Sequence, residues 1–291
     1  MKTLFLILES FRPRQWTKNL IIFAGILFSQ NITDLRMLAV TAAAFLVFCL
    51  LSGAVYTIND IVDAEEDKKH PLKSKRPVAS GRLNKNAALA ISLMIAAASL
   101  TASFFFGPVF LLISAGYLLL QLAYSFYLKQ LVIIDVFAIA LGFVLRVVAG
   151  AVAIDVEISS WFVICTILLS LFLGFSKRRH ELETLEDNAK KHRKVLNDYS
   201  QYLLDQMISV VTASTVIAYA LYTIAPETVE KFGTNNLIFT VPFVLYGIFR
   251  YLYLVHQKGE GGSPENILVS DVPLIIDILL WAATAAAILY F

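Results

Sequence analysis

The stretch that decides the fold is residues 37–67, which read MLAVTAAAFLVFCLLSGAVYTI over 37–58 and NDIVDAEED over 59–67. The first part carries no charge and is long enough for an α-helix to cross a bilayer, which takes about 20 apolar residues. The second part spaces Asp60, Asp63 and Asp67 three and then four residues apart, which on a helix places them on one face. We therefore predict a membrane helix that ends in a row of carboxylates at the membrane surface.

The apolar character extends over the whole chain of 291 residues. Hydrophobic residues make up 58% and charged residues 16%, which is too apolar for a soluble domain of this length. Runs of about 17 to 25 apolar residues predict nine spans, centred near Phe23, Val47, Ile95, Leu118, Leu141, Leu168, Val216, Val244 and Leu280. The first span is the weakest, because the apolar stretch 20–28 is short. We expect an all-α, polytopic bundle of nine transmembrane helices around a central cavity open to the cytoplasmic side, as a single domain over 1–291.

Basic residues are distributed unevenly between alternate loops. Two loops, about 59–85 and 177–205, lie four spans apart and carry seven Lys or Arg each, whereas only Arg36 and Lys231 fall on the opposite side. This asymmetry follows the positive-inside rule. It predicts a cytoplasmic N-terminus, an external C-terminus and both basic loops on the cytoplasmic side. Basic loops alone report topology, because most inner-membrane proteins carry them.

The acidic row predicts a divalent cation site. Carboxylate oxygens are the ligands that Mg²⁺ prefers, and Mg²⁺ in turn binds phosphates. The alternative is an interfacial helix whose acids only solvate it and favour its N-terminal end. Cys49 and Cys165 lie within predicted spans, so we expect no disulfide. The four histidines show no zinc-type spacing.

Arg146 is the most costly residue inside a predicted span, and such residues usually face a bundle interior or a wet cavity. Two interpretations stay open at this point. In the first, Arg146 contacts an anionic substrate group. In the second, it forms an internal ion pair with a carboxylate such as Asp135, which only sets helix packing.

The motif Asn-Asp-x-x-Asp-x-x-x-Asp at 59–67, followed within ten residues by Lys-Arg-Pro-Val-Ala-Ser-Gly at 75–81, resembles the first signature of the UbiA superfamily of intramembrane prenyltransferases. With the nine-span plan, the resemblance covers nearly the whole chain. It implies a helical bundle in the bacterial cytoplasmic membrane that holds Mg²⁺-diphosphate under the Asp-rich loop, in an active site that faces the cytoplasm. Most members carry a second Asp-rich motif after the sixth span, where this chain has Ser-Lys-Arg-Arg-His-Glu-Leu at 176–182.

Exchanging an acidic cluster for a basic one indicates a substrate with a further phosphate that cations contact directly. Together with Arg-Pro-Arg-Gln-Trp-Thr-Lys-Asn at 12–19 and Gly-Ser-Pro-Glu-Asn at 262–266, this departure makes the chain similar to the decaprenyl-phosphate phosphoribosyltransferase branch. The resemblance implies transfer of the 5-phosphoribosyl group from phosphoribosyl diphosphate to a long polyprenyl phosphate, with release of diphosphate and Mg²⁺ as cofactor. In relatives the product feeds an arabinose donor for the cell envelope.

Site residues follow from the same resemblance. It implies metal ligation and catalysis by Asn59, Asp60, Asp63 and Asp67. Contacts to the phosphates, the ribose or the acceptor headgroup are expected from Arg14, Lys18, Arg76, Lys129, Arg146, Lys177, Arg178 and Glu181. We expect Asp63 and Asp67 to project into solvent. The expected partners are phosphoribosyl diphosphate, polyprenyl phosphate and membrane lipids, with no nucleic acid and with a homo-oligomer left open.

Two rival functions are weighed against this one. The first is an aromatic or quinone prenyltransferase with a prenyl diphosphate donor, which the missing second Asp motif disfavours. The second is a transporter or lipid flippase. Transporters often break paired helices with Gly or Pro in mid-span, whereas Pro242 and Pro273 lie near predicted span ends.

Overall fold

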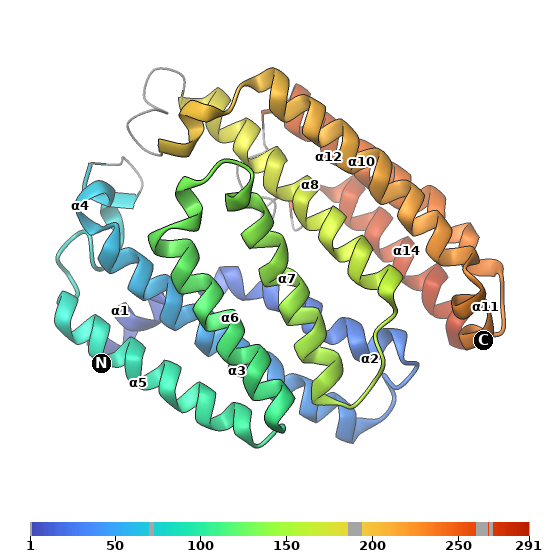
Figure 1. Ribbon diagram of the computed structural model, residues 1–291, viewed down its shortest axis with the longest axis horizontal. Helices are drawn as coiled ribbons and strands as arrows, with labels where there is room; N and C mark the ends of the chain where they lie inside the picture. Colours follow the sequence, from blue (N-terminus) through green and yellow to red (C-terminus); the bar gives the residue numbers. More distant parts are fainter. Residues whose placement is uncertain (1, 70–72, 186–193, 260–266, 268–269, 291) are drawn as a thin grey trace. The chain divides into compact units, whose positions relative to one another are not determined.

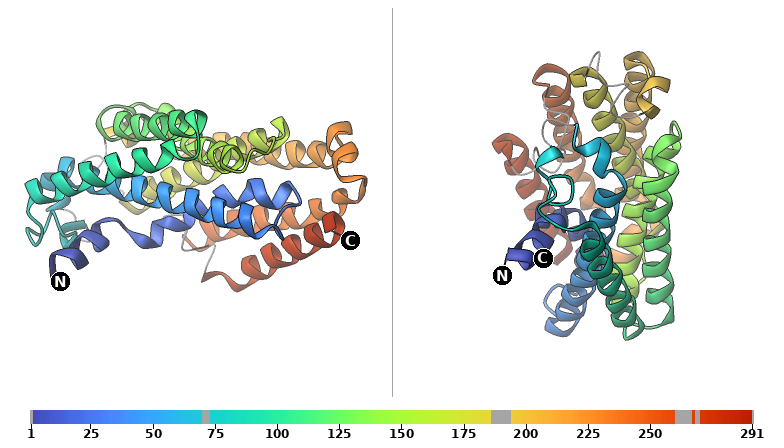
Figure 2. Two further views of the ribbon diagram at one scale, coloured as in Figure 1. Left: turned by 90° about the horizontal axis from the view of Figure 1, so that it is seen from below. Right: turned by 90° about the vertical axis from the view of Figure 1, so that its left-hand side faces the viewer.

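The computed structural model describes residues 2–69, 73–185, 194–259, 267 and 270–290, which are helical and contain no strand. The chain divides into two compact units. Unit 1 comprises Met1–Leu131 and Gly142–Ile158, and unit 2 comprises Val132–Leu141 and Ser159–Phe291. Figures 1 and 2 show the helices of both units.

Unit 1 is built around one long helix, α3, which contacts α5, α6 and η1. Its elements are α1 (Lys2–Ser10), η1 (Pro13–Phe23), α2 (Ala24–Phe28), α3 (Leu35–Val62), α4 (Ala64–Asp67), η2 (Lys73–Lys75), α5 (Lys85–Phe104), α6 (Pro108–Phe126), η3 (Leu128–Gln130) and the second half of α7 (Ile134–Ala153). Phe48 is fully buried, with its ring against Phe110 and Tyr117. This cluster holds α3 and α6 together.

Helix starts in unit 1 follow from capping residues in the sequence. Asp34 precedes α3, and its Oδ1 accepts hydrogen bonds from the backbone N–H groups of Arg36 and Met37 at 2.8 and 3.0 Å. Asn84 caps α5 in the same way. Such caps satisfy backbone donors that have no partner within the helix. The Asp34 cap sets where α3 begins.

The predicted first span differs from a regular α-helix. Residues Pro13–Phe23 form eleven residues of 3₁₀-helix, and the five residues of α2 follow. The segment runs antiparallel to α3, since Asn19 Nδ2 donates to Ser52 Oγ at 3.2 Å and the Phe23 ring packs on Phe45. A 3₁₀-helix rises about 2.0 Å per residue, so η1 and α2 together extend about 30 Å, close to the thickness of a bilayer core.

Eight helices in the described part of the chain are long and apolar enough to cross a membrane, and each contains one of the predicted centres from Val47 onward. Eight of the nine predicted spans are therefore confirmed by length and composition. The span centred near Phe23 stays a prediction. Near the end of η1 the Ile22 carbonyl packs directly against Gly150 of α7. A Cβ on Gly150 would lie 2.1 Å from the Ile22 oxygen.

Unit 2 packs four long helices and the start of α7. The elements are α8 (Ser160–Leu185), η4 (Lys194–Asp198), α10 (Gln201–Ile224), α11 (Pro226–Phe232), η5 (Asn236–Thr240), α12 (Val241–Gln257) and α14 (Val272–Tyr290). Phe172 of α8 and Tyr251 of α12 stack edge to face, with ring centroids 5.2 Å apart. Leu196 and Leu204 complete the centre of this core. The eight apolar helices make the protein an integral membrane protein.

Candidate functional site

The acidic row lies at the end of α3. Asp63 ends α3 and precedes α4, yet the helical hydrogen bonding continues across it. The Asp63 N–H donates to the Asn59 carbonyl at 2.9 Å, and the Asp67 N–H donates to the Asp63 carbonyl at 2.8 Å. Because the register is kept, Asp60 and Asp67 share a face, as their spacing predicted. Both reach a single side chain, that of Arg76.

Arg76 bridges two buried carboxylates. Its Nη1 donates to Asp60 Oδ1 at 3.0 Å and to Asp67 Oδ2 at 2.5 Å. Asp60 is 1% exposed and Asp67 is 3% exposed. The expectation that Asp67 projects into solvent is therefore wrong. Asp67 can be buried because the Arg76 guanidinium compensates its charge. A carboxylate without such a partner would have to stay in contact with water.

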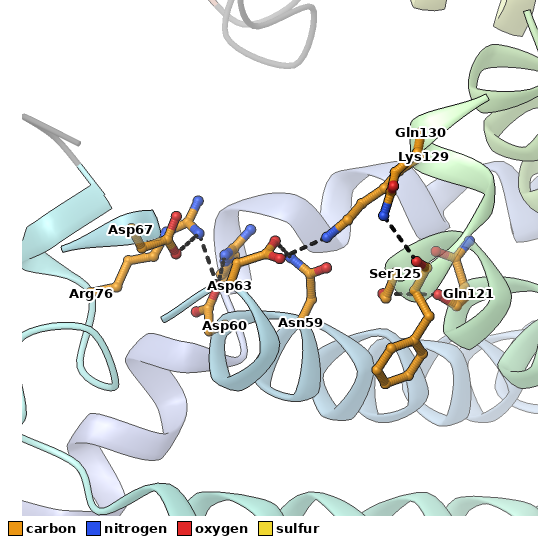
Figure 3. Close-up of polar contacts among 11 residues, drawn as sticks. Asn59, Asp60, Asp63, Asp67, Arg76, Gln121, Ser125, Lys129 and Gln130 are labelled. Carbon is orange, nitrogen blue, oxygen red and sulfur yellow. Dashed lines mark hydrogen bonds and ion pairs between the residues drawn. The ribbon is translucent and has the colours of Figure 1, made fainter. Parts of the chain in front are cut away.

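Two further cations complete the cluster. Arg12 lies just before η1 and forms an ion pair with Asp60. Lys129 of η3 donates from Nζ to Asp63 Oδ1 at 2.7 Å, and Asn59 Nδ2 donates to the other oxygen of Asp63 at 3.1 Å. Figure 3 shows these contacts in a row, with Arg76 at one end and Lys129 at the other. We call Asn59, Asp60, Asp63, Asp67, Arg12, Arg76 and Lys129 the acidic–basic cluster.

The acidic–basic cluster pairs three carboxylates with three cations. Four of its members were predicted as metal ligands, and Arg76 and Lys129 were predicted as substrate contacts, so the structure brings six predicted residues together. Arg12 was missed. It belongs to the quoted motif 12–19, but Arg14 and Lys18 were preferred there. Arg12 takes a left-handed backbone conformation with φ 52°, which directs the chain so that Arg12 meets Asp60 while Arg14 is exposed.

The acids of the cluster fit Mg²⁺ in their chemistry. They supply hard oxygen donors, and Asp60 Oδ2 is buried without a hydrogen-bond partner in the described part of the chain. Their present arrangement is that of an ion-paired site. Among the described residues, no group of three or more His, Cys, Asp or Glu side chains is close enough to share an ion. For the acids to share a metal, Arg76 and Lys129 would have to release them.

Arg146 is buried in unit 1, and its partners are neutral. Its Nε donates to Asn19 Oδ1 at 2.6 Å, its Nη1 to the Gly142 carbonyl at 2.9 Å and its Nη2 to the Tyr117 hydroxyl at 2.6 Å. Within the residues that the structure describes, no carboxylate pairs with it. Of the two interpretations left open from the sequence, the one with an Asp135 ion pair is therefore wrong in its partner, although the guanidinium does join helices within the bundle. The guanidinium instead ties α6, α7 and η1 together.

In unit 2, the predicted phosphate contact Arg178 is 1% exposed and engaged by acids. Its Nε donates to Asp135 Oδ2 at 2.6 Å, and its Nη1 donates to Glu181 Oε2 at 2.9 Å. The Tyr199 hydroxyl donates to the other oxygen of Asp135 at 2.8 Å. Sequence reasoning missed this network, because Asp135 lies 43 residues from Arg178. Lys177 is half-buried beside it.

Tyr199 also supports an unusual backbone. Ile133, just before α7, has φ 70°, which is a strained value for a β-branched residue. The Ile133 N–H donates to the Tyr199 oxygen at 2.6 Å. Burial, and then the adjacent Asp135 carboxylate, raise the pKa of the Tyr199 phenol. The phenol therefore remains a donor to Asp135 at physiological pH. The basic residues 190–193 and the motif 262–266 lie outside the described residues.

Comparisons with known proteins place these features in a family. Residues 19–265 match the UbiA prenyltransferase family. The chain is 32% identical to a decaprenyl-phosphate phosphoribosyltransferase of Mycolicibacterium smegmatis, over 98% of this chain and 92% of the relative. It is 33% identical to a protein of that name from Corynebacterium glutamicum, over 94% and 83% of the two chains.

A solved structure shares the fold. The UbiA homolog from Archaeoglobus fulgidus, bound to GPP and Mg²⁺, superposes with a TM-score of 0.74 at 20% identity, and the match covers 98% of this chain and 100% of the homolog. The likeness confirms the all-helical architecture. The family match, the shared fold and the Asp-rich motif at 59–67 all indicate the same family. The chain belongs to the UbiA prenyltransferase family.

Proposed function

We propose that this enzyme transfers the 5-phosphoribosyl group from phosphoribosyl diphosphate to a polyprenyl phosphate of decaprenyl type and releases diphosphate. The observation that carries the proposal is the acidic–basic cluster, in which Asp60, Asp63 and Asp67 meet Arg12, Arg76 and Lys129. Such a cluster suits a diphosphate held through a divalent ion and by cations together. The relatives named as phosphoribosyltransferases support this donor over others.

The acids have the role of holding Mg²⁺. Asn59, Asp60, Asp63 and Asp67 would bind it, and bound Mg²⁺ neutralises negative charge on the leaving diphosphate. Carboxylates alone repel a diphosphate, so the proposal entails a requirement for a divalent cation. Asp60 Oδ2 is the most suitable first ligand, because it is buried and has no hydrogen-bond donor within the described residues.

The three cations have a second role. Arg12, Arg76 and Lys129 now neutralise the acids, and we propose that they turn to the phosphate oxygens of the donor when the acids take up metal. A guanidinium donates two parallel hydrogen bonds to a phosphate, which a lysine cannot do. Arg12 and Arg76 are therefore the proposed orienting contacts, and Lys129 supplies charge.

The acceptor needs little activation. A phosphomonoester is an anion at neutral pH, with a second pKa near 6, so its oxygen attacks the anomeric carbon without a strong general base. Catalysis then depends on position and electrostatics. We propose Lys177 as a phosphate contact. Arg178 and Glu181 are proposed to hold the segment that carries Lys177, since Arg178 is buried among acids.

The remaining proposed site residues have two different roles. They are Arg14, Lys18 and Arg146. Arg14 is exposed and Lys18 is half-buried on η1, and we propose both as contacts for the acceptor headgroup. Arg146 is proposed to act through position, by holding Asn19 and Tyr117. We further propose a cytoplasmic-membrane location with the acidic–basic cluster on the cytoplasmic side, which the positive-inside pattern supports.

The test is incubation of purified protein with Mg²⁺, radiolabelled phosphoribosyl diphosphate and polyprenyl phosphates of several lengths. We expect label in the lipid extract, and none after chelation of divalent ions. A prenyl diphosphate with aromatic acceptors runs in parallel. Prenylated product there, without labelled lipid in the first reaction, would replace the proposed donor by a prenyl diphosphate.

Asp63→Asn is the matched variant for the metal role, and Glu65→Gln is its control. Both changes remove one charge, but Glu65 is exposed on α4 and bonds only Lys68 and Lys85 among the described residues. We expect Asp63→Asn to lower turnover by about 100-fold, the scale of lost transition-state electrostatics, and Glu65→Gln to leave it unchanged. Full turnover of a folded Asp63→Asn enzyme would reject the metal assignment.

A further inference from the structure

A groove runs between α10 and α12 in unit 2. It has a volume of about 740 Å³, within the usual range of about 300 to 1,000 Å³ for small-molecule sites. Its walls are mostly apolar and include Val216, Ile217, Leu245 and Phe249. Both helices belong to candidate membrane spans. The occupant of such a groove comes from the bilayer and presents a hydrocarbon chain to it.

One end of the groove is polar and holds the carboxylate of Asp205, which forms an ion pair with Arg179. Asp205 lines it, and Asp205 Oδ1 accepts a hydrogen bond from Arg179 Nε at 2.7 Å and lies 3.4 Å from His256 Nε2. The second oxygen, Oδ2, has no donor among the residues described. Asp205 is 42% exposed. The bonds to Oδ1 therefore hold the Asp205 side chain in place, and Oδ2 can accept a hydrogen bond from a ligand in the groove.

A positive charge lies next to the same end. Lys258 follows α12, and its Nζ lies 6.0 Å from the centroid of the Tyr253 ring, which lines the groove. A ligand head that enters here meets the Asp205 carboxylate, whose Oδ1 is paired with Arg179, and the ammonium group of Lys258. This combination favours a zwitterion. A polyprenyl phosphate has no cationic group that could bond Asp205 Oδ2.

A polar atom also lies deeper, among the apolar walls. Thr212 lines the groove, is about nine-tenths buried, and its Oγ1 has no hydrogen-bond partner in the described chain. It lies seven residues beyond Asp205, or about 10 Å along a helix. Threonine in a helix populates two χ1 rotamers, so its hydroxyl can turn toward an acceptor in the groove. A buried donor without a partner is costly, which points to an acceptor on the ligand.

We propose that the groove is a specific site for a glycerophospholipid with an ammonium headgroup, of the phosphatidylethanolamine class. The ammonium group bonds Asp205 Oδ2, the phosphate lies beside Lys258, an ester carbonyl accepts from Thr212, and one acyl chain fills the apolar walls. The groove shares no residue with the acidic–basic cluster, and the proposed lipid binding does not depend on the proposed reaction.

The experiment is native mass spectrometry of the full chain, stripped of lipid in detergent and titrated with lipids of matched acyl chains. We expect one phosphatidylethanolamine per chain, bound about tenfold or more tightly than phosphatidylglycerol, since a charge-assisted hydrogen bond is worth at least that factor. The ether-linked analogue lacks the ester carbonyl, so it should bind severalfold more weakly. Equal binding of the two headgroups, or displacement of the phospholipid by polyprenyl phosphate, would overturn the proposal.

Variants separate the groove from general lipid adhesion. Asp205→Asn should lower phosphatidylethanolamine affinity about tenfold and leave phosphatidylglycerol unchanged, and Thr212→Val should abolish the difference between ester and ether lipids. Ala213→Phe fills the groove and should prevent binding. Ala98→Phe makes the same change on the exposed face of α5 and should not. Each variant must first keep the thermal midpoint of the lipid-free protein, and unaltered binding by a folded Ala213→Phe protein would exclude the site.

Discussion

Replacing Arg178 with methionine is expected to remove about 3–5 kcal/mol of stability, the cost of leaving a buried charge without its partner. Asp135 and Arg178 are 0% and 1% exposed, and their atoms lie 2.6 Å apart. An exposed pair would be worth only about 0.2–1 kcal/mol. In the variant, Asp135 loses its ion pair with Arg178 but keeps the hydrogen bond from the Tyr199 hydroxyl, a neutral donor that does not compensate a full negative charge.

The double variant makes the argument quantitative. Asp135→Asn added to Arg178→Met removes the stranded charge, so we expect most of the loss to be recovered, because a buried ion pair replaced as a whole is often neutral. The coupling energy from the double-mutant cycle should be about 3 kcal/mol or more, because Arg178→Met alone leaves a buried charge without its partner and the double change does not. Reversible unfolding in mixed micelles, followed by circular dichroism, measures all four proteins.

Arg179→Met is the matched control. It changes the next residue in the same way, but Arg179 pairs with Glu183 and Asp205, which are 45% and 42% exposed. A loss below about 1 kcal/mol is expected. If Arg178→Met were as stable as the native protein and lost only donor binding, then Arg178 would act as a substrate contact, and the structural role assigned to the network would be refuted.

Three more predictions concern single contacts. Gly150→Ala should lower the thermal midpoint sharply, because the new Cβ would lie 2.1 Å from the backbone oxygen of Ile22; an unchanged midpoint would mean that η1 does not pack there. Arg146→Met should cost about 2 kcal/mol or more, since it strands the buried Tyr117 hydroxyl and two other acceptors, while a charge-keeping Arg146→Lys should restore only part of the stability in the same melt. The Arg250 guanidinium bonds Asp271 and holds the pKa of that carboxyl below its usual range. The stability from this pair is therefore present above about pH 4 and is lost as the pH falls through the lower pKa of the folded state. Thermal melts from pH 7 to pH 3 should show this loss in the native protein and not in Asp271→Asn.

Much of the fold was predictable because it depends on local pattern. Eight long helices contain eight predicted centres, since hydrophobic length alone determines whether a helix can span a bilayer. The segment 13–28 escaped a firm prediction for a physical reason. Its close approach to Gly150 of α7 is a tertiary contact that has no signature in the segment's own composition.

The candidate site was predictable only in part. The row of acids follows from spacing on one helix, and the structure keeps that register through Asp63. Their burial did not follow, because an acid is buried only where a cation from elsewhere compensates it. Asp67 was expected in solvent and is 3% exposed, since Arg76 folds back over it from the following loop.

The amino-acid sequence by itself determined that this chain is a membrane protein, where its helices lie, and that carboxylates gather at the end of α3, because hydropathy and helical period act over a few neighbouring residues. Only the tertiary structure decided which cation meets which acid. Arg12 and Asp60 are 48 residues apart, and Lys129 and Asp63 are 66 apart. Such pairs depend on how whole helices pack and on a left-handed turn at Arg12, and no local pattern encodes either.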